Sequence, residues 1–242
     1  MYSVLRAQLR IHYWVASRSS RRSVNAVLLA TEVRILMPTL PRYRSFAAGR
    51  IQSGDALVRH GYSNAERQGA MDQADELALL QQCRGRMLAE SGQAPAGWLS
   101  PWTSESLHTP DLLAETGYGY RLQLVSRRAV AADAHALWQT AVGRAVSASV
   151  DNIPMIMHRQ MDGKDFAQMN FDQTDEMIEQ AKSPSAAPLI MGVALHSYIV
   201  GQPYRLRHLR RAVQHIAAAR DSGQLCMTTP GAIFRHAAQM NV

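Results

Sequence analysis

The chain has 242 residues, of which 47% are apolar, and a formal net charge of +7. Its apolar runs are all shorter than the roughly 18–20 residues that a transmembrane helix needs, so we expect a soluble protein without a membrane span. The positive charge does not predict nucleic-acid binding. It gathers in residues 1–50 and 121–150, and in neither segment do the arginines recur at the helical spacing that would place them on one helix face. Cys83 and Cys226 lie far apart in apolar surroundings, which favours reduced thiols and a cytoplasmic location.

The first 45 residues have the composition of a basic leader. They are rich in Arg and Ser, and the first acidic residue is Glu32. An organellar transit peptide and a leader without a defined fold both fit this composition, and the second is favoured. We therefore predict a domain that begins at about residue 46.

Two helices are predicted between residues 54 and 120. The stretch over residues 66–92 has apolar residues at helical spacing, acids early and Gly92 as a left-handed stop. The sequence TPDLLAETG predicts a helix with Thr109 as N-cap, Pro110 in the first helical position and Gly117 as terminator.

Helices and strands alternate after residue 150. We predict a helix over residues 164–183, a strand over 188–196 that is buried on both faces of a parallel sheet, and a helix over 205–223. A short strand at 225–228 and a helix capped by Thr229 follow. The alternation predicts βα units around a parallel sheet or barrel.

Two histidines follow predicted strands. His196 ends the apolar run PLIMGVALH, and His60 follows the strand-like GDALVR. Polar residues at the carboxyl ends of barrel strands line active sites, so His196 is a candidate general acid and His60 a candidate acid, electrophile or metal ligand. From spacing alone, the functional role of His196 and a structural role, in which its ring only caps the sheet or bonds a backbone carbonyl, are about equally favoured.

The loop GWLSPW lies between these histidines. Trp98, Pro101 and Trp102 would form a rigid apolar wall for a substrate if the loop lies at the same edge. The alternative is that both tryptophans pack in the core.

Several segments together resemble the polysaccharide deacetylase (NodB-type) family. They are HGYSN, APAGWLSPWTSESLHTPDLLAETGYGY, DNIPMI, MGVALHSYIVGQPYRLRHLRRAVQHI and TTPGAI, and within the family they are most similar to the allantoinase-like branch of cyclic-amide hydrolases. The resemblance implies a distorted (β/α) barrel, incomplete at its N-terminus, that hydrolyses a non-peptide C–N bond of a carbohydrate or cyclic amide.

The resemblance also implies roles for particular residues. His196 matches the late-strand general acid, and His60 matches the first histidine of a metal-binding pair. Trp98, Pro101 and Trp102 match the substrate-side loop, and Asn152 lies in a matching segment where it would bind substrate.

The sequence departs from the family pattern at the metal site. Asn64 stands where the second metal-binding histidine would be, and no aspartate pair occurs in the first 50 residues. The sequence therefore leaves open whether a divalent metal such as zinc is bound or none is. It also leaves open a second function, a catalytically inactive remnant or binding domain of the same fold.

The resemblance stops at Tyr120 and returns at Asp151. The Arg- and Ala-rich segment between them is typical of a diverged stretch or of a gene read out of frame, and the DNA sequence across these codons would distinguish the two. Strands lost in this way would leave sheet edges uncovered, so we expect self-association.

Overall fold

The computed structural model describes residues 56–62, 66–122, 151–183, 189–232 and 234–235, together with two strands at residues 11–17 and 26–35. Asn64, the remainder of the predicted leader and the irregular segment over residues 123–150 lie outside the described residues. The chain divides into two compact units. The first unit contains residues 1–31 and 145–229, and the second contains residues 32–144 and 230–242.

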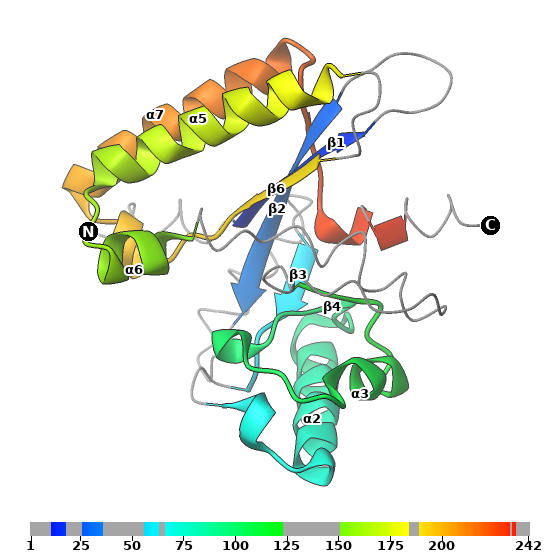
Figure 1. The fold of residues 1–242 in the computed structure, drawn as a ribbon. Coiled ribbons are helices and arrows are strands. Elements are labelled where there is room, and N and C mark those ends of the chain that lie inside the picture. The colour runs from blue at the N-terminus through cyan, green and yellow to red at the C-terminus, as the bar shows by residue number, and fades with distance from the viewer. Residues whose placement is uncertain are drawn as a thin grey trace. The chain divides into compact units, whose positions relative to one another are not determined.

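The sheet of the first unit mixes antiparallel and parallel pairs (Figure 1). Strand β1 (Ile11–Ser17) pairs antiparallel with β6 (Leu189–Val193) and with β7 (Cys226–Met227). The first part of β2 (Ala26–Ile35) pairs parallel with β7. The predicted strand at 188–196 is therefore confirmed, but the prediction that it lies in a parallel sheet is wrong for its pairing with β1, which is antiparallel. The pairing partner, β1, comes from the segment that we predicted as a basic leader.

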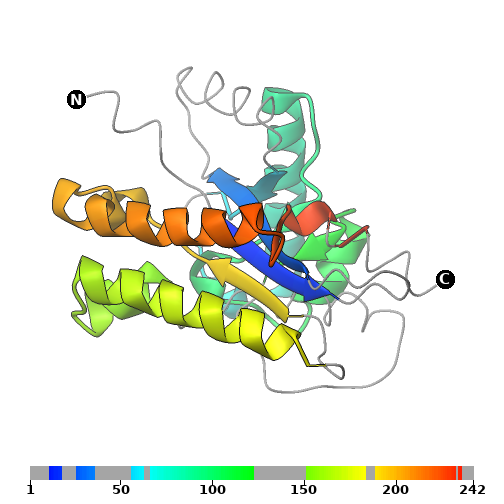
Figure 2. The ribbon, with the colours of Figure 1, turned by 90° about the horizontal axis from the view of Figure 1, so that it is seen from above.

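Two long helices lie side by side on one face of this sheet (Figures 1 and 2). Helix α5 (Gly163–Ala181) begins with a capping box, in which the Asp162 carboxylate accepts from backbone N–H groups of the first turn. Helix α7 is Pro203–Asp221. Both confirm the predicted helices. Two shorter helical segments complete the unit, the π-helical η5 (Ile153–His158) and α6 (Ser197–Val200).

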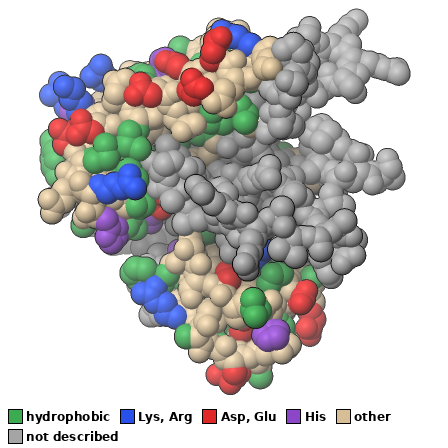
Figure 3. Space-filling model, viewed as in Figure 1, with side chains coloured by type: hydrophobic (Ala, Val, Ile, Leu, Met, Phe, Trp, Pro, Cys, Tyr) green, Lys and Arg blue, Asp and Glu red, His purple; other side chains and the backbone are tan. Residues whose placement is uncertain are grey.

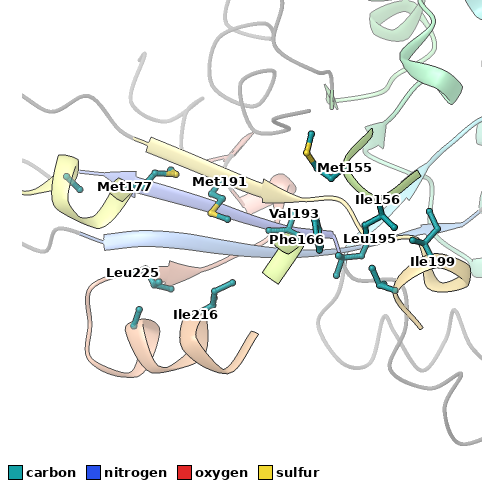
Figure 4. Packing of buried hydrophobic residues seen from close by; sticks show 13 residues of the cluster. Met155, Ile156, Phe166, Met177, Met191, Val193, Leu195, Ile199, Ile216 and Leu225 are labelled. Carbon is teal, nitrogen blue, oxygen red and sulfur yellow. The ribbon is translucent and has the colours of Figure 1, made fainter. Parts of the chain in front are cut away.

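The first unit has its own hydrophobic core, which joins both helices to β6 (Figure 4). Met191 and Val193 of β6 are buried in it. The neighbouring Ala194 is also buried, which confirms that the segment is covered on both faces. Other members are Met155, Ile156, Phe166, Met177, Leu195, Ile199, Ile216 and Leu225.

The second unit contains a parallel sheet. Its strands are residues 32–35 of β2, then β3 (Ala56–Arg59), β4 (Gly97–Trp98) and β5 (Tyr120–Arg121), each paired parallel with the next. Since the strands are parallel, their carboxyl ends lie at one edge, where α/β proteins bind ligands.

The predicted helix over residues 66–92 is confirmed as α2 (Gln73–Ser91), which follows the short 3-10 turn η2 (Gln68–Ala70). The Asp72 carboxylate caps its first turn, and Gly92 ends it at a φ of 72°. This left-handed backbone is the conformation that glycine adopts without a steric cost.

The second predicted helix is α3 (Thr109–Glu115). Thr109 is its first helical residue, and the N-cap position is occupied by His108, so the predicted Thr109 cap is wrong. The Thr109 hydroxyl is engaged elsewhere, because it donates to the buried carboxylate of Glu76. The predicted terminator Gly117 is confirmed, with a φ of 81°.

The core of the second unit lies between β4 and the helices α2 and α3. Trp98 is at its centre, with its ring edge-on to Tyr118 at a centroid distance of 5.4 Å. Cys83 of α2 is buried in the same cluster, and burial raises the pKa of its thiol. The other buried members are Leu79, Leu80, Leu112 and Leu113.

Candidate functional site

His196 lies three residues after β6, beside Asn152. Its Nδ1 and the Asn152 Oδ1 are 2.7 Å apart, and the Asn152 Nδ2 donates to the backbone carbonyl of His196 over 3.4 Å. The amide oxygen can only accept, so the Nδ1 of His196 carries a hydrogen. Asn152 is fully buried, while the His196 side chain is about one-fifth exposed. The amide thus fixes both the ring orientation and the tautomer of a partly accessible imidazole.

Asp151 is a third member of this cluster, and the sequence analysis did not identify it. Its Oδ1 is 3.9 Å from the Nδ1 of His196 and accepts a hydrogen bond from the Ile153 N–H. An isolated bridge pairs Asp151 with Ala194, just beyond β6. The two groups lie within the distance of an ion pair when the imidazole is protonated. The signal was the pair Asp151–Asn152 directly before an apolar run, which resembles the polar end of a strand.

The π-helical segment η5 starts directly after this pair. Its single π-turn is an uncommon conformation that is found disproportionately at functional sites. Here it turns the chain away from the sheet immediately after Asn152.

His60 directly follows β3 and is largely buried. Its Nδ1 lies 2.7 Å from the backbone carbonyl oxygen of Leu99, the residue after β4. Since a carbonyl only accepts, the Nδ1 is the protonated nitrogen and Nε2 carries the lone pair of the neutral ring. This tautomer is the one that suits an Nε2 metal ligand or acceptor. The bond also ties together the carboxyl ends of two neighbouring strands.

The two tryptophans of GWLSPW have opposite environments. Trp98 has an exposed fraction of 0%, and its indole N–H lies within hydrogen-bond distance of Gln68 Oε1 and Ser100 Oγ. Trp102 is 55% exposed, with the Arg67 guanidinium stacked 3.8 Å from its ring centroid. The two rings therefore do not form one continuous wall.

The loop around Trp102 holds an uncommon backbone conformation. Trp102 and Thr103 have φ values of 58° and 55°, in the left-handed region that costs a side-chain-bearing residue energy. Pro101 before them is buried. Backbone strain of this kind persists where the surrounding structure imposes it, and it is frequent at binding sites.

A buried polar network supplies that surrounding structure. The Glu76 carboxylate, at 0% exposure, accepts hydrogen bonds from Gln68, Ser106 and Thr109. Gln68 in turn accepts from Trp98. The network thereby joins α2 and the start of α3 to the carboxyl end of β4.

A second carboxylate continues the network at the loop. Glu105 Oε1 accepts from the Ser100 hydroxyl over 2.9 Å, and its Oε2 pairs with the Arg121 guanidinium. Desolvation of the side chain, which is 6% exposed, raises the pKa of Glu105, and the charge of Arg121 opposes this only in part. The loop that carries Trp102 is thus anchored on both sides by buried polar groups.

The structure brings His196, Asn152 and Asp151 together in the first unit. His60, Trp98, Pro101 and Trp102 belong to the second unit. In the described parts of the chain, no three His, Cys, Asp or Glu side chains gather closely enough to hold a metal ion. The described ligands therefore do not make a complete zinc site around His60. In the same parts, no helix is both long and apolar enough to cross a membrane.

No protein-family model and no curated protein matches the chain in sequence. Solved structures match it in fold. An assigned polysaccharide deacetylase from Mycobacterium smegmatis aligns with a TM-score of 0.64 and 19% identity, over 87% of this chain and 73% of that protein.

Two further structures match equally well. PuuE allantoinase and an assigned polysaccharide deacetylase from Pseudomonas aeruginosa PAO1 each align with a TM-score of 0.64 and 19% identity. Each alignment covers 81% of this chain and 63% of the other, so the chain spans less than two thirds of these two proteins. At this identity the likeness concerns the fold, and the chain is a mixed α/β protein with a deacetylase-like fold.

Proposed function

We propose that the protein is a hydrolase of a non-peptide C–N bond, in which His196 is the general acid. The observation that carries this proposal is the hydrogen bond between His196 Nδ1 and the buried Asn152 amide. It holds one ring nitrogen as a donor to the protein, so that proton exchange with a substrate would use Nε2. The likeness in fold to deacetylase structures supports the same reaction class.

The chemistry of this step follows from the ring and its neighbours. Water adds to the amide carbonyl, and the tetrahedral intermediate collapses by breaking its C–N bond. The departing nitrogen must gain a proton to leave as an amine, and the His196 imidazolium would donate it from Nε2. Asp151, 3.9 Å from Nδ1, would stabilise the imidazolium before the transfer. The proposal assigns this acid step and no other.

The remaining predicted site residues receive revised roles. Asn152 is fully buried, so we assign it to the orientation of His196 in place of direct contact with substrate. Trp98 is assigned to packing for the same reason. Trp102 has an open aromatic surface and is the residue of GWLSPW that we assign to substrate, with the buried Pro101 supporting its loop. His60 is assigned to binding substrate or a divalent metal through Nε2.

We place these residues on a distorted (β/α) barrel, with the substrate an N-acetylated carbohydrate or a cyclic amide. An aromatic ring with the 55% exposure of Trp102 suits both, since it can stack on the apolar face of a sugar or on a planar imide. The resemblance of the motifs to the allantoinase-like branch favours the cyclic amide.

The experiment is a hydrolysis assay on acetylated chito-oligosaccharide, allantoin and a cyclic imide, with and without added zinc. Wild type is compared with His196→Ala and with the control His108→Ala, an exposed histidine to which the proposal gives no role. Turnover by wild type and His108→Ala that is lost in a folded His196→Ala supports the proposal. Equal turnover in all three would remove His196 from the mechanism.

A second candidate is a binding domain of the same fold without catalysis. The stacked pair of Trp102 and Arg67 favours it, because an exposed, prepositioned ring can bind a ligand without any acid or base. Binding of the same compounds without turnover, weakened in Trp102→Ala and unchanged in His196→Ala, would establish this candidate.

A further inference from the structure

The outward surface formed by α5 and α7 carries two parallel stripes of opposite charge. On α7, the arginines that are exposed and have no ion-pair partner among the described residues are Arg207, Arg210 and Arg211. Their spacing of three and four residues places them on one side of the helix. On α5, the exposed acids that have no cationic partner among the described residues include Asp172 and Glu176. Figure 3 shows acidic and basic side chains on this part of the surface.

The arginines of α7 differ in their contacts. Arg205 donates to the carbonyl of Ile199, and Arg220 pairs with Asp221. In the described part of the chain, the other three make no hydrogen bond or ion pair. Like charges at these spacings destabilise a helix, and the first turn of α7 contains no acid to offset them. Because the repulsion among these three arginines destabilises the isolated helix, we infer that they bind a partner outside the single chain.

The two helices run parallel, which fixes how the stripes are aligned. Gly163 at the start of α5 packs against Arg205 near the start of α7. Further along, the carboxylate of Asp175 and the Nε2 of His215 are 2.6 Å apart. By interpolation, Arg207 is level with Asp165, and Arg211 lies about two residue rises, or about 3 Å, before the level of Asp172.

We propose that this surface, defined by the stripe Arg207, Arg210 and Arg211 and the stripe Asp165, Asp172 and Glu176, binds a second copy of the same chain. A two-fold axis parallel to the helices and between them places α7 of each copy over α5 of the other. It keeps the level of every residue, so each arginine stripe faces the partner's acidic stripe, with Arg207 level with Asp165 and Arg211 close to Asp172. The contact is isologous, as two-fold interfaces are.

The size of the surface sets the strength of the dimer. Two 19-residue helices are each about 28 Å long and about 10 Å wide, so the face covers about 550 Å² on each copy. Stable dimers bury about 800 Å² per partner. The surface is also charged where strong interfaces are apolar. It therefore forms a weak dimer that added salt dissociates, since the Debye length falls from about 10 Å at 0.1 M to about 3 Å at 1 M salt.

The test is sedimentation velocity of the full chain with two charge-reversal variants. Arg207→Glu/Arg210→Glu/Arg211→Glu makes both stripes acidic. Asp172→Arg/Glu176→Arg gives the acidic stripe a net positive charge and leaves Asp165 in place, because Asp165 belongs to the capping box of α5. Wild type is expected to dimerise at low ionic strength and to dissociate at about 1 M salt. Each variant alone is expected to be monomeric, and an equimolar mixture of the two to recover the dimer. Asp111→Arg/Glu115→Arg on α3 is the matched control for the second variant, and it is expected to dimerise like wild type.

Recovery of the dimer in the mixture cannot arise from misfolding of either variant, so it identifies the complementary stripes as the interface. A monomeric wild type at low ionic strength overturns the proposal, whether or not an added polyanion such as heparin binds the arginines. A wild-type dimer that persists in both variants, or a mixture that remains monomeric although wild type dimerises, also overturns it.

Discussion

The imidazole Nδ1 of His196 lies 2.7 Å from the amide oxygen of Asn152, and the same amide donates back to the carbonyl of His196. One fully buried side chain thus binds both the ring and the backbone of the residue that follows β6. The orientation of His196 depends on a residue 44 positions earlier in the chain.

Asn152→Ala tests this dependence. The substitution leaves the His196 Nδ1–H without its acceptor and opens a small cavity, so we expect the free energy of unfolding to fall by about 1–3 kcal/mol. If His196 is the general acid, kcat should fall while KM changes little, because a ring in the wrong orientation still leaves the substrate contacts intact. Urea titration and initial rates measure the two effects. Gln180→Ala, on the exposed face of α5, is the control and should change neither.

The two tryptophans of GWLSPW should respond differently to truncation. Trp98→Ala removes a fully buried ring with two hydrogen-bond contacts, and we expect a loss of about 3–5 kcal/mol in the free energy of unfolding. Trp102→Gly removes an exposed ring and relieves the left-handed backbone, and we expect a change of at most about 1 kcal/mol. Chemical denaturation of both variants measures this contrast. Equal losses would contradict the packing role of Trp98 and the exposed role of Trp102.

The buried carboxylate of Glu76 gives a third prediction. Glu76→Ala leaves the donors of Gln68, Ser106 and Thr109 without their acceptor, and we expect a loss of about 2–4 kcal/mol. The exposed control Glu115→Ala should stay within about 0.5 kcal/mol of wild type. Urea denaturation measures both. A neutral result for Glu76→Ala would show that the donors find other partners.

The sequence predicted the elements whose signals are local. The helices α2, α5 and α7 were predicted from apolar spacing, and their ends at Gly92 and Asp162 follow ordinary capping chemistry. The apolar run before His196 was predicted as a strand because its residues are continuously apolar, and Met191, Val193 and Ala194 are indeed buried.

The features that the sequence could not predict depend on partners far along the chain. The antiparallel pairing of β6 requires β1, which lies more than 170 residues earlier, in the segment predicted as a leader. The N-cap of α3 was misassigned because the Thr109 hydroxyl binds Glu76, 33 residues earlier. The role of Asp151 becomes visible only when its carboxylate is placed beside His196. In each case a tertiary contact, and not a local propensity, decides the outcome.

The last prediction concerns the pH dependence that Glu105 introduces. Burial raises the pKa of this carboxyl above its ordinary value of 4.5, so the folded protein holds the proton to a higher pH than the unfolded chain does. The stability that this proton contributes is complete below the ordinary pKa and is lost as the pH rises through the pKa of the folded state.

Glu105→Gln removes this titration, keeps one oxygen as an acceptor for Arg121, and replaces the oxygen that accepts from Ser100 with an amide NH2 group. We therefore expect the difference in free energy of unfolding, variant minus wild type, to increase as the pH rises from about 4.5 towards 8. Urea denaturation of both proteins across this range measures the difference. If the variant instead loses stability relative to wild type over the same range, the attraction between Glu105 and Arg121 outweighs the desolvation of the carboxylate. In that case the pair is an ordinary stabilising ion pair that holds the Trp102 loop through its charge.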